Sequence, residues 1–284
     1  MLDPGKWHLL QNRQSENLAD KPGLENETDE AKWTKWRGCM SAIEKLRERM
    51  EAMRPEVLIV VGDDQHENLL DDNMPPFTIY MGEEAEASVS LRYLNQARSD
   101  NRTKYLVDSK MADAIITGLM DHGFDPSYSK KTRYEGGLGH AFARVLKFLV
   151  PQTNCRVIPI MVNTYYPPAP SAKRCLEFGK TLASLIRQYP SNDRVVIAAS
   201  GGLSHTKIDE RLDAEFLQAL QSNDTAYLSA MPSALFREGT SEILNWIVIA
   251  GAADRNGQVV DYLPLYRTRT GVGCAMGFAY WDLS

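Results

Sequence analysis

Two histidines of this chain lie in sequence contexts that favour chemistry over a purely structural role. His205 directly follows SGGLS at residues 200–204, and His140 follows the glycine-rich stretch YEGGLG at residues 134–139. Glycine has no side chain, so it lets the backbone approach a bound ligand closely. We therefore predict a functional histidine at position 205 and a second histidine, His140, that could line the same crevice.

A cluster of donor side chains, GDDQHEN, occupies residues 62–68. Carboxylate, amide and imidazole groups of these kinds bind hard or borderline divalent cations. An ordinary solvated turn explains the same composition equally simply. The sequence that follows includes Pro76 and Phe77, and this pairing of prolines with aromatic residues predicts the wall of a pocket for a flat substrate.

Glu242 lies within TSEILNWI at residues 240–247, among apolar neighbours. One interpretation is a plain helix start, with Thr240 as the N-cap and Glu242 in the first turn, where the helix dipole stabilises a carboxylate. The other interpretation is a buried ligand. The local pattern favours neither of them.

The elements that must position these residues alternate along the chain. Continuous apolar runs predict buried strands and three-to-four-residue periodicity predicts helices. The predicted strands cover residues 57–61, 156–162 and 194–199, and the predicted helices cover residues 29–53, 109–120, 138–149, 171–187, 209–221 and 241–250.

This order predicts an α/β fold, a layered sheet of mostly buried strands flanked by helices, in a single domain over residues 1–284. Residues 11–30 are polar and acidic with hardly any large apolar residues, and residues 1–28 are predicted to form a surface segment. Ligands of such sheets bind at the carboxyl ends of the strands. Residues 63–68, 163–168 and 201–205 should therefore border one crevice.

Composition excludes several classes of partner. The 284 residues carry 32 Lys and Arg against 37 Asp and Glu, so there is no basic surplus for binding nucleic acid. The apolar runs are far shorter than the roughly 20 residues of a membrane span, and no secretory signal is visible. The four cysteines have no CxxC spacing, which indicates buried thiols in a reducing compartment. We expect a cytoplasmic protein without a membrane segment.

Taken together, these stretches resemble the class III extradiol ring-cleavage dioxygenases, the superfamily of the protocatechuate 4,5-dioxygenase catalytic subunit. The resemblance runs from about residue 30 to the C-terminus, and its GDDQ stretch is closest to the methylgallate dioxygenase-like branch. It rests on VVGDDQ at residues 60–65, MPPF at 74–77, the glycines before His140, VNTYYPP at 162–168, GGLSH at 201–205, and Glu242 with Trp246.

The resemblance implies an oxidoreductase of aromatic catabolism that cleaves the ring of a catechol-type aromatic acid with O2 and non-heme Fe(II). Two histidines and one glutamate would hold the iron and leave positions open for substrate and O2. Glu242 matches the carboxylate ligand, His205 matches the acid–base catalyst, and His140 matches a second pocket histidine.

The two histidine ligands are the points where this sequence departs from the pattern. The second ligand position aligns with Gln65, and His66 follows one residue later. Because neighbouring strand residues point to opposite faces, either Gln65 offers its amide oxygen or a bulge turns His66 inward, and we favour Gln65. Residues 1–7 resemble the segment that follows the first ligand histidine, which we expect upstream of them.

The resemblance also points to substrate-binding residues, namely Asn163 and Tyr165 together with Pro76 and Phe77. A cation of the Lys173–Arg174 pair could bind the substrate carboxylate, although a solvated helix start is the simpler interpretation. Relatives often pair two chains or carry a small second subunit. We therefore expect a homo-oligomer or a partner subunit.

Two other functions remain open. The first is a non-catalytic binding member of the same superfamily, which the uncertain histidine ligands favour. The second is a metal-assisted hydrolase that uses the Asp63–Asp64 pair with zinc or manganese. A serine hydrolase is disfavoured, because the sequence around Ser204 lacks the Gly-x-Ser-x-Gly elbow.

Overall fold

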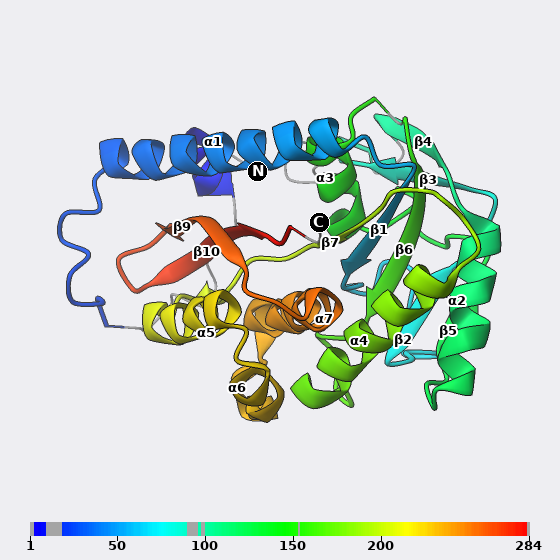
Figure 1. Ribbon diagram of the computed structural model, residues 1–284. Coiled ribbons are helices and arrows are strands. Elements are labelled where there is room, and N and C mark those ends of the chain that lie inside the picture. The colour runs from blue at the N-terminus through cyan, green and yellow to red at the C-terminus, as the bar shows by residue number, and fades with distance from the viewer. Residues whose placement is uncertain (1–2, 10–18, 90–95, 98–99, 153, 283–284) are drawn as a thin grey trace.

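A five-stranded sheet forms the centre of the computed structural model, which describes residues 3–9, 19–89, 96–97, 100–152 and 154–282. Its strand order is β5-β2-β6-β1-β7, and β2 and β5 run opposite to the other three strands (Figure 1). The strands are β1 (Val57–Gly62), β2 (Phe77–Tyr80), β5 (Ser127–Ser129), β6 (Arg156–Val162) and β7 (Val195–Ala199).

Strand β1 shows why this sheet is buried on both faces. The side chains of Val57, Ile59 and Val61 enter one core and those of Leu58 and Val60 enter another, because successive strand residues alternate between faces. The first core is covered by α2 (Ser109–Asp121), α4 (Ala172–Gln188) and α7 (Ile243–Ala253). The second is covered by α3 (His140–Leu149) and the hairpin of β3 (Glu84–Ser88) and β4 (Arg102–Leu106).

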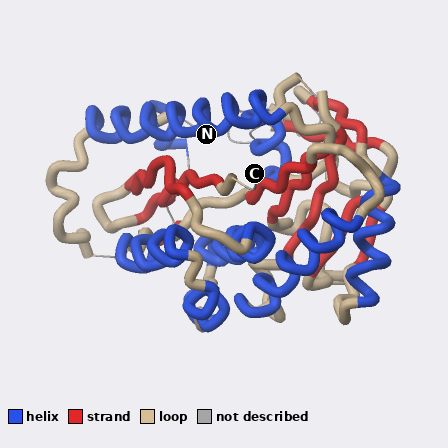
Figure 2. The backbone as a smooth tube through the Cα atoms, viewed as in Figure 1, coloured by secondary structure: helices blue, strands red, loops and turns tan. Residues whose placement is uncertain are grey.

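A second, three-stranded antiparallel sheet lies beside the first and has the order β8-β10-β9. Its strands are β8 (His205–Lys207), β9 (Gln258–Tyr266) and β10 (Val272–Tyr280). The long helix α1 (Asp29–Met53) packs on β9 and β10, and α5 (Glu210–Ser222) contacts β9 from the other side (Figure 1, Figure 2). The short helix α6 (Thr225–Ala230) connects α5 to the 3-10 turns Ser233–Leu235 and Glu238–Glu242 that precede α7.

The α/β fold class is confirmed, with a central sheet flanked by helices. Each predicted strand and helix is present within about three residues of its predicted bounds. The pattern missed the short strands β2, β3, β4, β5 and β8 and the whole β9–β10 hairpin. In β9 most residues are half-buried, and Asp261 and Pro264 interrupt the apolar residues. Strand β10 is mostly apolar, but it carries two glycines, which are unfavourable inside a strand.

Two residues of the predicted surface segment are buried. Trp7, in the 3-10 turn Pro4–Leu9, packs with Cys39 and Ala42 of α1, and Leu24 joins the core beside α5. Residues 10–18 of that segment lie outside the described residues. Within the described ranges, no helix combines the length and the apolarity that crossing a membrane requires.

Candidate active site

The predicted acid–base and ligand residues meet in one large cavity. It has a volume of about 1430 Å³ and lies between α1, α3, β7 and β10. The side chains that line it include Asp63, Gln65, His140, His205 and Glu242. They come from the ends of β1 and β7, from the start of α3 and from the turn before α7. Two of the three segments predicted to border one crevice, residues 63–68 and 201–205, contribute to this cavity, whereas residues 163–168 do not line it.

His205 and Glu242 form a direct acid–base contact in this cavity. The imidazole Nε2 lies 3.1 Å from Oε1 of Glu242, whose Oε2 accepts a hydrogen bond from the Gly202 backbone N–H. The other ring nitrogen, Nδ1, lies 3.0 Å from the carbonyl of Leu203. Burial opposes the charged imidazolium, but the facing carboxylate outweighs it and raises the pKa of His205. Burial likewise opposes the charge of Glu242, and His205 outweighs it and lowers the pKa of that carboxyl.

The turn before α7 is shaped to hold the His205 ring. Glu242 ends the 3-10 turn, and α7 begins one residue later, two residues after the predicted helix start at residue 241. Thr240 does not cap α7; its hydroxyl accepts from the backbone N–H of His205 and donates to the His205 carbonyl. A Cβ at Gly239 would lie 1.9 Å from Cδ2 of His205, so only glycine allows this approach.

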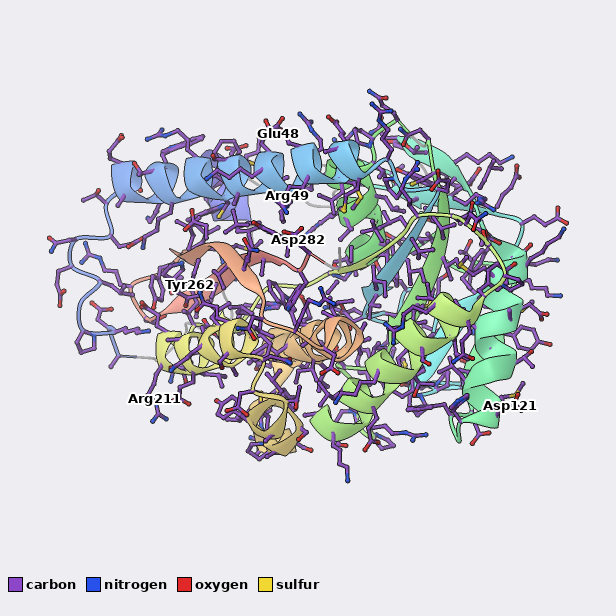
Figure 3. The ribbon with its side chains drawn as sticks, viewed as in Figure 1. Glu48, Arg49, Asp121, Arg211, Tyr262 and Asp282 are labelled. Carbon is purple, nitrogen blue, oxygen red and sulfur yellow. The ribbon has the colours of Figure 1, made fainter. Side chains whose placement is uncertain are left out.

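A buried carboxylate from α5, that of Asp213, holds the backbone just before His205. Asp213 is 0% exposed and accepts hydrogen bonds from the backbone N–H of Ser204 at 2.8 Å and from its hydroxyl at 2.6 Å. Tyr262 of β9, labelled in Figure 3, donates to the same carboxylate at 2.7 Å. Ser204 immediately precedes His205. Asp213 therefore sets the position of the imidazole through the backbone.

Asp63 and Gln65, which follow β1, reach the same carboxylate. The Gln65 amide donates to Oδ2 of Asp63 at 3.0 Å and to Oε1 of Glu242 at 3.4 Å. Asp63 is 1% exposed, and within the described part of the chain its Oδ1 has no hydrogen-bond partner. Burial, reinforced by the nearby Glu242 charge, raises the pKa of Asp63 to about 7.

His66 lies away from Glu242, although it is adjacent to Gln65 in sequence. Its backbone is left-handed, with φ of 57°, and its ring stacks on Tyr166 with centroids 3.7 Å apart. Its Nε2 pairs with Asp71 at 3.1 Å. Of the two residues predicted for the second ligand position, the structure therefore places Gln65 beside Glu242 and His66 against the outer loop.

His140 is the first residue of α3 and lines the same cavity, where its charge acts to lower the pKa values of both Asp63 and Glu242. Glu67 accepts from its backbone N–H at 2.9 Å and lies 3.0 Å from its ring Nδ1. A carboxylate at this helix end satisfies a free N–H group and is favoured by the helix dipole. Burial lowers the pKa of His140, but Glu67 outweighs that effect and the net shift is upward.

The residues predicted to bind substrate lie outside this cavity. Phe77 belongs to the apolar core and stacks on Phe178 with centroids 4.3 Å apart, while Pro76 is exposed. Asn163 is 2% exposed and uses its amide to fix the carbonyls of its own loop. Tyr165 lies nearest to the site, since burial and the charges of Glu238, Glu242 and Asp63, in that order, raise its pKa.

The pair Lys173–Arg174 occupies the first turn of α4 and is also remote from the cavity. Arg174 donates to the carbonyl of Gly123 at 2.7 Å and stacks its guanidinium on Phe124. Lys173 is largely exposed beside Glu177. These contacts agree with the helix-start interpretation of the two residues.

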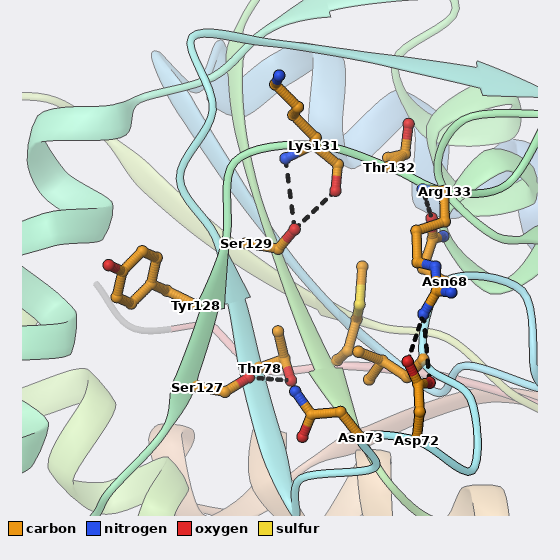
Figure 4. A pocket seen from close by; sticks show the side chains of 12 residues that line it. Asn68, Asp72, Asn73, Thr78, Ser127, Tyr128, Ser129, Lys131, Thr132 and Arg133 are labelled. Atoms are coloured by element: carbon orange, nitrogen blue, oxygen red, sulfur yellow. Dashed lines mark hydrogen bonds and ion pairs between the residues drawn. The ribbon is translucent and has the colours of Figure 1, made fainter.

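A second, smaller pocket of about 200 Å³ lies beside β2 and β5 and shares no lining residue with the large cavity (Figure 4). Four of its polar side chains form two pairs. Thr78 hydrogen-bonds Ser127 at 2.8 Å, and Arg133 pairs with Asp72 at 3.1 Å. This pocket therefore offers no comparable group of unpaired acids or histidines.

Comparison with models of protein families identifies the family of this chain. Residues 21–277 match the family described as LigB, the catalytic LigB subunit of aromatic ring-opening dioxygenase. The chain belongs to this family.

Curated relatives of this chain match about half of it. A 2,3-dihydroxyphenylpropionate/2,3-dihydroxicinnamic acid 1,2-dioxygenase of Pseudomonas putida is 31% identical over 174 residues, which are 58% of this chain and 51% of that protein. The gallate dioxygenase of Pseudomonas putida is 31% identical over 157 residues, which are 50% of this chain and 44% of that protein. The chain thus spans about half the length of the curated relatives it matches.

A solved structure shares the fold. The crystal structure of uncharacterized protein JW3007 from Escherichia coli K12 matches with a TM-score of 0.51 and 15% sequence identity. The match covers 82% of this chain and 91% of that one. At this identity it supports the α/β architecture and carries no information on activity.

The described residues do not complete the ligand set that the LigB family implies. Among them, no group of three or more histidine, cysteine, aspartate and glutamate side chains has the arrangement of a metal site. Glu242 and Gln65, the residues that the sequence resemblance matches to two ligand positions, lie side by side, with the Gln65 amide donating to Oε1 of Glu242 at 3.4 Å. Oδ1 of Asp63 is the one further oxygen in this cluster that is buried without a partner. This cluster of Glu242, Gln65 and Asp63 therefore offers more oxygen atoms and fewer nitrogen atoms than a metal site made of two histidines and a glutamate.

Several residues that shape the LigB-family site were not found from the sequence. Asp213, Tyr262 and Thr240 act on His205 from positions 8 to 57 residues away, and no local motif joins them. Glu67 is different, because it lies within the predicted donor cluster. The sequence identified that cluster, but not that this carboxylate would bind His140.

Proposed function

We propose that this chain carries the ring-cleaving activity of an extradiol dioxygenase, which opens a catechol-type aromatic acid with O2. The observation that carries the proposal is the contact of His205 with Glu242 at the inner end of a large cavity, in a LigB-family chain. An imidazole held against a carboxylate is suited to general acid–base work on a catechol. The named dioxygenases among the relatives support the same reaction class.

His205 is the residue we propose as acid–base catalyst. Both of its ring nitrogens face acceptors, the Leu203 carbonyl and the Glu242 carboxylate, so the structure favours the protonated ring. The proton at Nε2 points toward the cluster that contains Glu242, Gln65 and Asp63. A catechol hydroxyl or a product oxygen that reached this cluster could exchange that proton with His205. His140, held by Glu67 in the same cavity, is proposed as a second pocket histidine.

Ferrous iron is the cofactor we propose on the strength of the family. Glu242 is the proposed carboxylate ligand, and Gln65 is the proposed occupant of the second position. Because the described residues do not complete a ligand set, no step of the reaction is assigned to the metal. We further expect an aromatic substrate and O2 as partners, a cytoplasmic protein, and a homo-oligomer or a small second subunit.

Oxygen consumption tests the proposal. The protein is loaded anaerobically with Fe(II), and O2 uptake and new absorbance are followed with protocatechuate, gallate, 3-O-methylgallate and 2,3-dihydroxyphenylpropionate. We expect stoichiometric uptake with a ring-opened chromophore for at least one substrate. His205→Ala should bind the same substrate and lower turnover by about 10²- to 10⁴-fold. Unchanged turnover in that variant would remove His205 from its role.

A non-catalytic binding function is the second candidate. Gln65 favours it, because the amide at the second ligand position is already bound to Asp63 and Glu242. This candidate predicts that aromatic acids bind in the cavity without any uptake of O2. Binding without uptake, under the loading conditions above, would exchange the first proposal for this one.

A further inference from the structure

The large cavity is lined by six basic side chains besides its histidines, and three of them already have partners. Arg49 pairs with Asp282 at 2.5 Å (Figure 3), and Arg255 donates to the carbonyl of Asp282 at 2.9 Å. Arg267 also has a partner. The remaining three are Arg144, Lys147 and Arg187.

Arg144 is the one of these three that lies beside the proposed catalytic residues. It follows His140 by four residues on α3, so the two side chains occupy one face of the helix, about 6 Å apart along the axis. Its charge acts on His140, since it works against the upward pKa shift of that ring. Within the described residues Arg144 has no hydrogen bond or ion pair, and its side chain is exposed to the cavity.

The charge balance of the cavity gives this cation a function. At the acid–base cluster, the Glu242 carboxylate faces His205 at 3.1 Å, so that imidazole is already paired and is not free to bind an anionic ligand. A substrate carboxylate buried in this cavity therefore needs another cation as its partner, because burying an unpaired charge is costly. A guanidinium suits this position, because its parallel N–H groups bind a carboxylate through two hydrogen bonds.

We propose that Arg144 binds the carboxylate of the aromatic acid and makes the cavity selective for carboxylated catechols over uncharged ones. This inference rests on the proposed function, because it takes the hydroxyl end of the ring to lie at His205 and Glu242. Arg144 replaces the Lys173–Arg174 pair as the predicted carboxylate partner. Those two residues lie on α4 and do not line the cavity.

The test is an anaerobic binding measurement on the Fe(II)-loaded protein that needs no turnover. Trp7, Trp246 and Trp281 line the cavity, so tryptophan fluorescence can report ligand binding directly. Protocatechuate is the carboxylated probe, and catechol is the matched probe without the carboxylate. Lys147→Met is the matched control, because it removes one positive charge from the same helix and the same cavity.

We expect Arg144→Met to raise the Kd for protocatechuate about 10- to 100-fold, which is the range for losing a hydrogen-bonded charge pair. The Kd for catechol should stay within about twofold, Lys147→Met should leave both values unchanged, and Arg144→Lys should recover part of the loss. An equal loss for both probes, or no loss for protocatechuate, would overturn the role of Arg144. Selective binding without O2 uptake would instead contradict ring cleavage and leave this inference standing.

Discussion

The turns that follow β1 and β7 both deliver site residues to Glu242, but they are held in place by different means. The β1 turn, residues 63–69, is closed by its own Asp64, which accepts from the backbone N–H groups of Glu67, Asn68 and Leu69. The β7 turn, residues 200–205, is held by Asp213 of α5, together with Thr240 from the turn before α7.

The β1 turn is therefore held by hydrogen bonds between residues close in sequence, whereas the β7 turn is held by hydrogen bonds to residues of other elements. Asp64 binds donors three to five residues along the chain, so the β1 turn can form with few distant contacts. Asp213 can act only when α5, β9 and the β7 turn have come together. The acid–base residue His205 therefore depends on the completed fold, whereas Gln65 depends mainly on its own loop.

Removing the tertiary carboxylate should give the largest loss of stability. Asp213→Ala leaves the N–H and hydroxyl of Ser204 and the Tyr262 hydroxyl without their acceptor in the interior. Breaking a buried hydrogen-bonded network around a charge costs about 3–5 kcal/mol. Urea denaturation measures this cost as a fall in the free energy of unfolding. A loss below about 1 kcal/mol would show that Asp213 does not hold the β7 turn.

Removing the local carboxylate should cost less. Asp64→Ala leaves the backbone N–H groups of Glu67 and Leu69 without their acceptor. Both residues are half-buried, so water can reach these N–H groups after a small movement of the turn. We expect a loss of about 1–3 kcal/mol in the same urea experiment. Asp72→Ala, in the same loop but bound only to exposed Arg133, is the matched control and should change stability by less than about 0.5 kcal/mol. If Asp64→Ala costs as much as Asp213→Ala, the two turns do not differ as described.

The same contrast explains which parts of the site the sequence could predict. Strand β1 reads as a continuous apolar run and the donor cluster follows it directly, so both its position and its polarity are visible locally. Glu242 was visible only as a carboxylate among apolar residues, because its partner His205 lies 37 residues earlier in the chain. The burial of Phe77 in the core could not be predicted either, because it depends on stacking against Phe178, which is distant in the sequence. From the local pattern alone, Phe77 was predicted to form a pocket wall.

Asp63 lies in the β1 turn, and the proton on its carboxyl group should make the free energy of unfolding of the protein depend on pH. The pKa is about 7 in the folded chain and near 3.8 when unfolded, so the folded state holds the proton more tightly. The contribution of Asp63 is therefore fully present below pH 4 and is lost as the pH rises from about 4 to about 7. The slope of this loss is at most about 1.4 kcal/mol per pH unit.

Denaturation of the metal-free chain at pH 4.5, 5.5 and 6.5 checks this expectation. Asp63→Asn removes the titrating proton and keeps the size of the side chain, so its stability should fall less steeply with pH than that of the wild type. His205 also titrates with a raised pKa, but its loss of stability falls above this window and is common to both proteins. Parallel pH profiles for the two proteins would contradict a protonated Asp63.

The smallest effect is expected at His66, the second residue that could have occupied the ligand position. His66→Ala removes a stack on Tyr166 and an ion pair with Asp71, whose side chain is 94% exposed. Contacts of this kind stabilise a protein by about 0.5–1.5 kcal/mol in total. Turnover with the best substrate should change by less than about twofold, because the ring does not reach Glu242.

Gln65→Ala is the matched variant one residue earlier. It removes the amide that joins Asp63 to Glu242, so it leaves two buried carboxyl groups adjacent without the donor between them. We expect Gln65→Ala to lower turnover at least about tenfold more than His66→Ala does. The reason is that a hydrogen bond to a charged group contributes about 1.5–3 kcal/mol. The reverse order of the two variants would mean that the β1 turn rearranges in the working protein and brings His66 to the site.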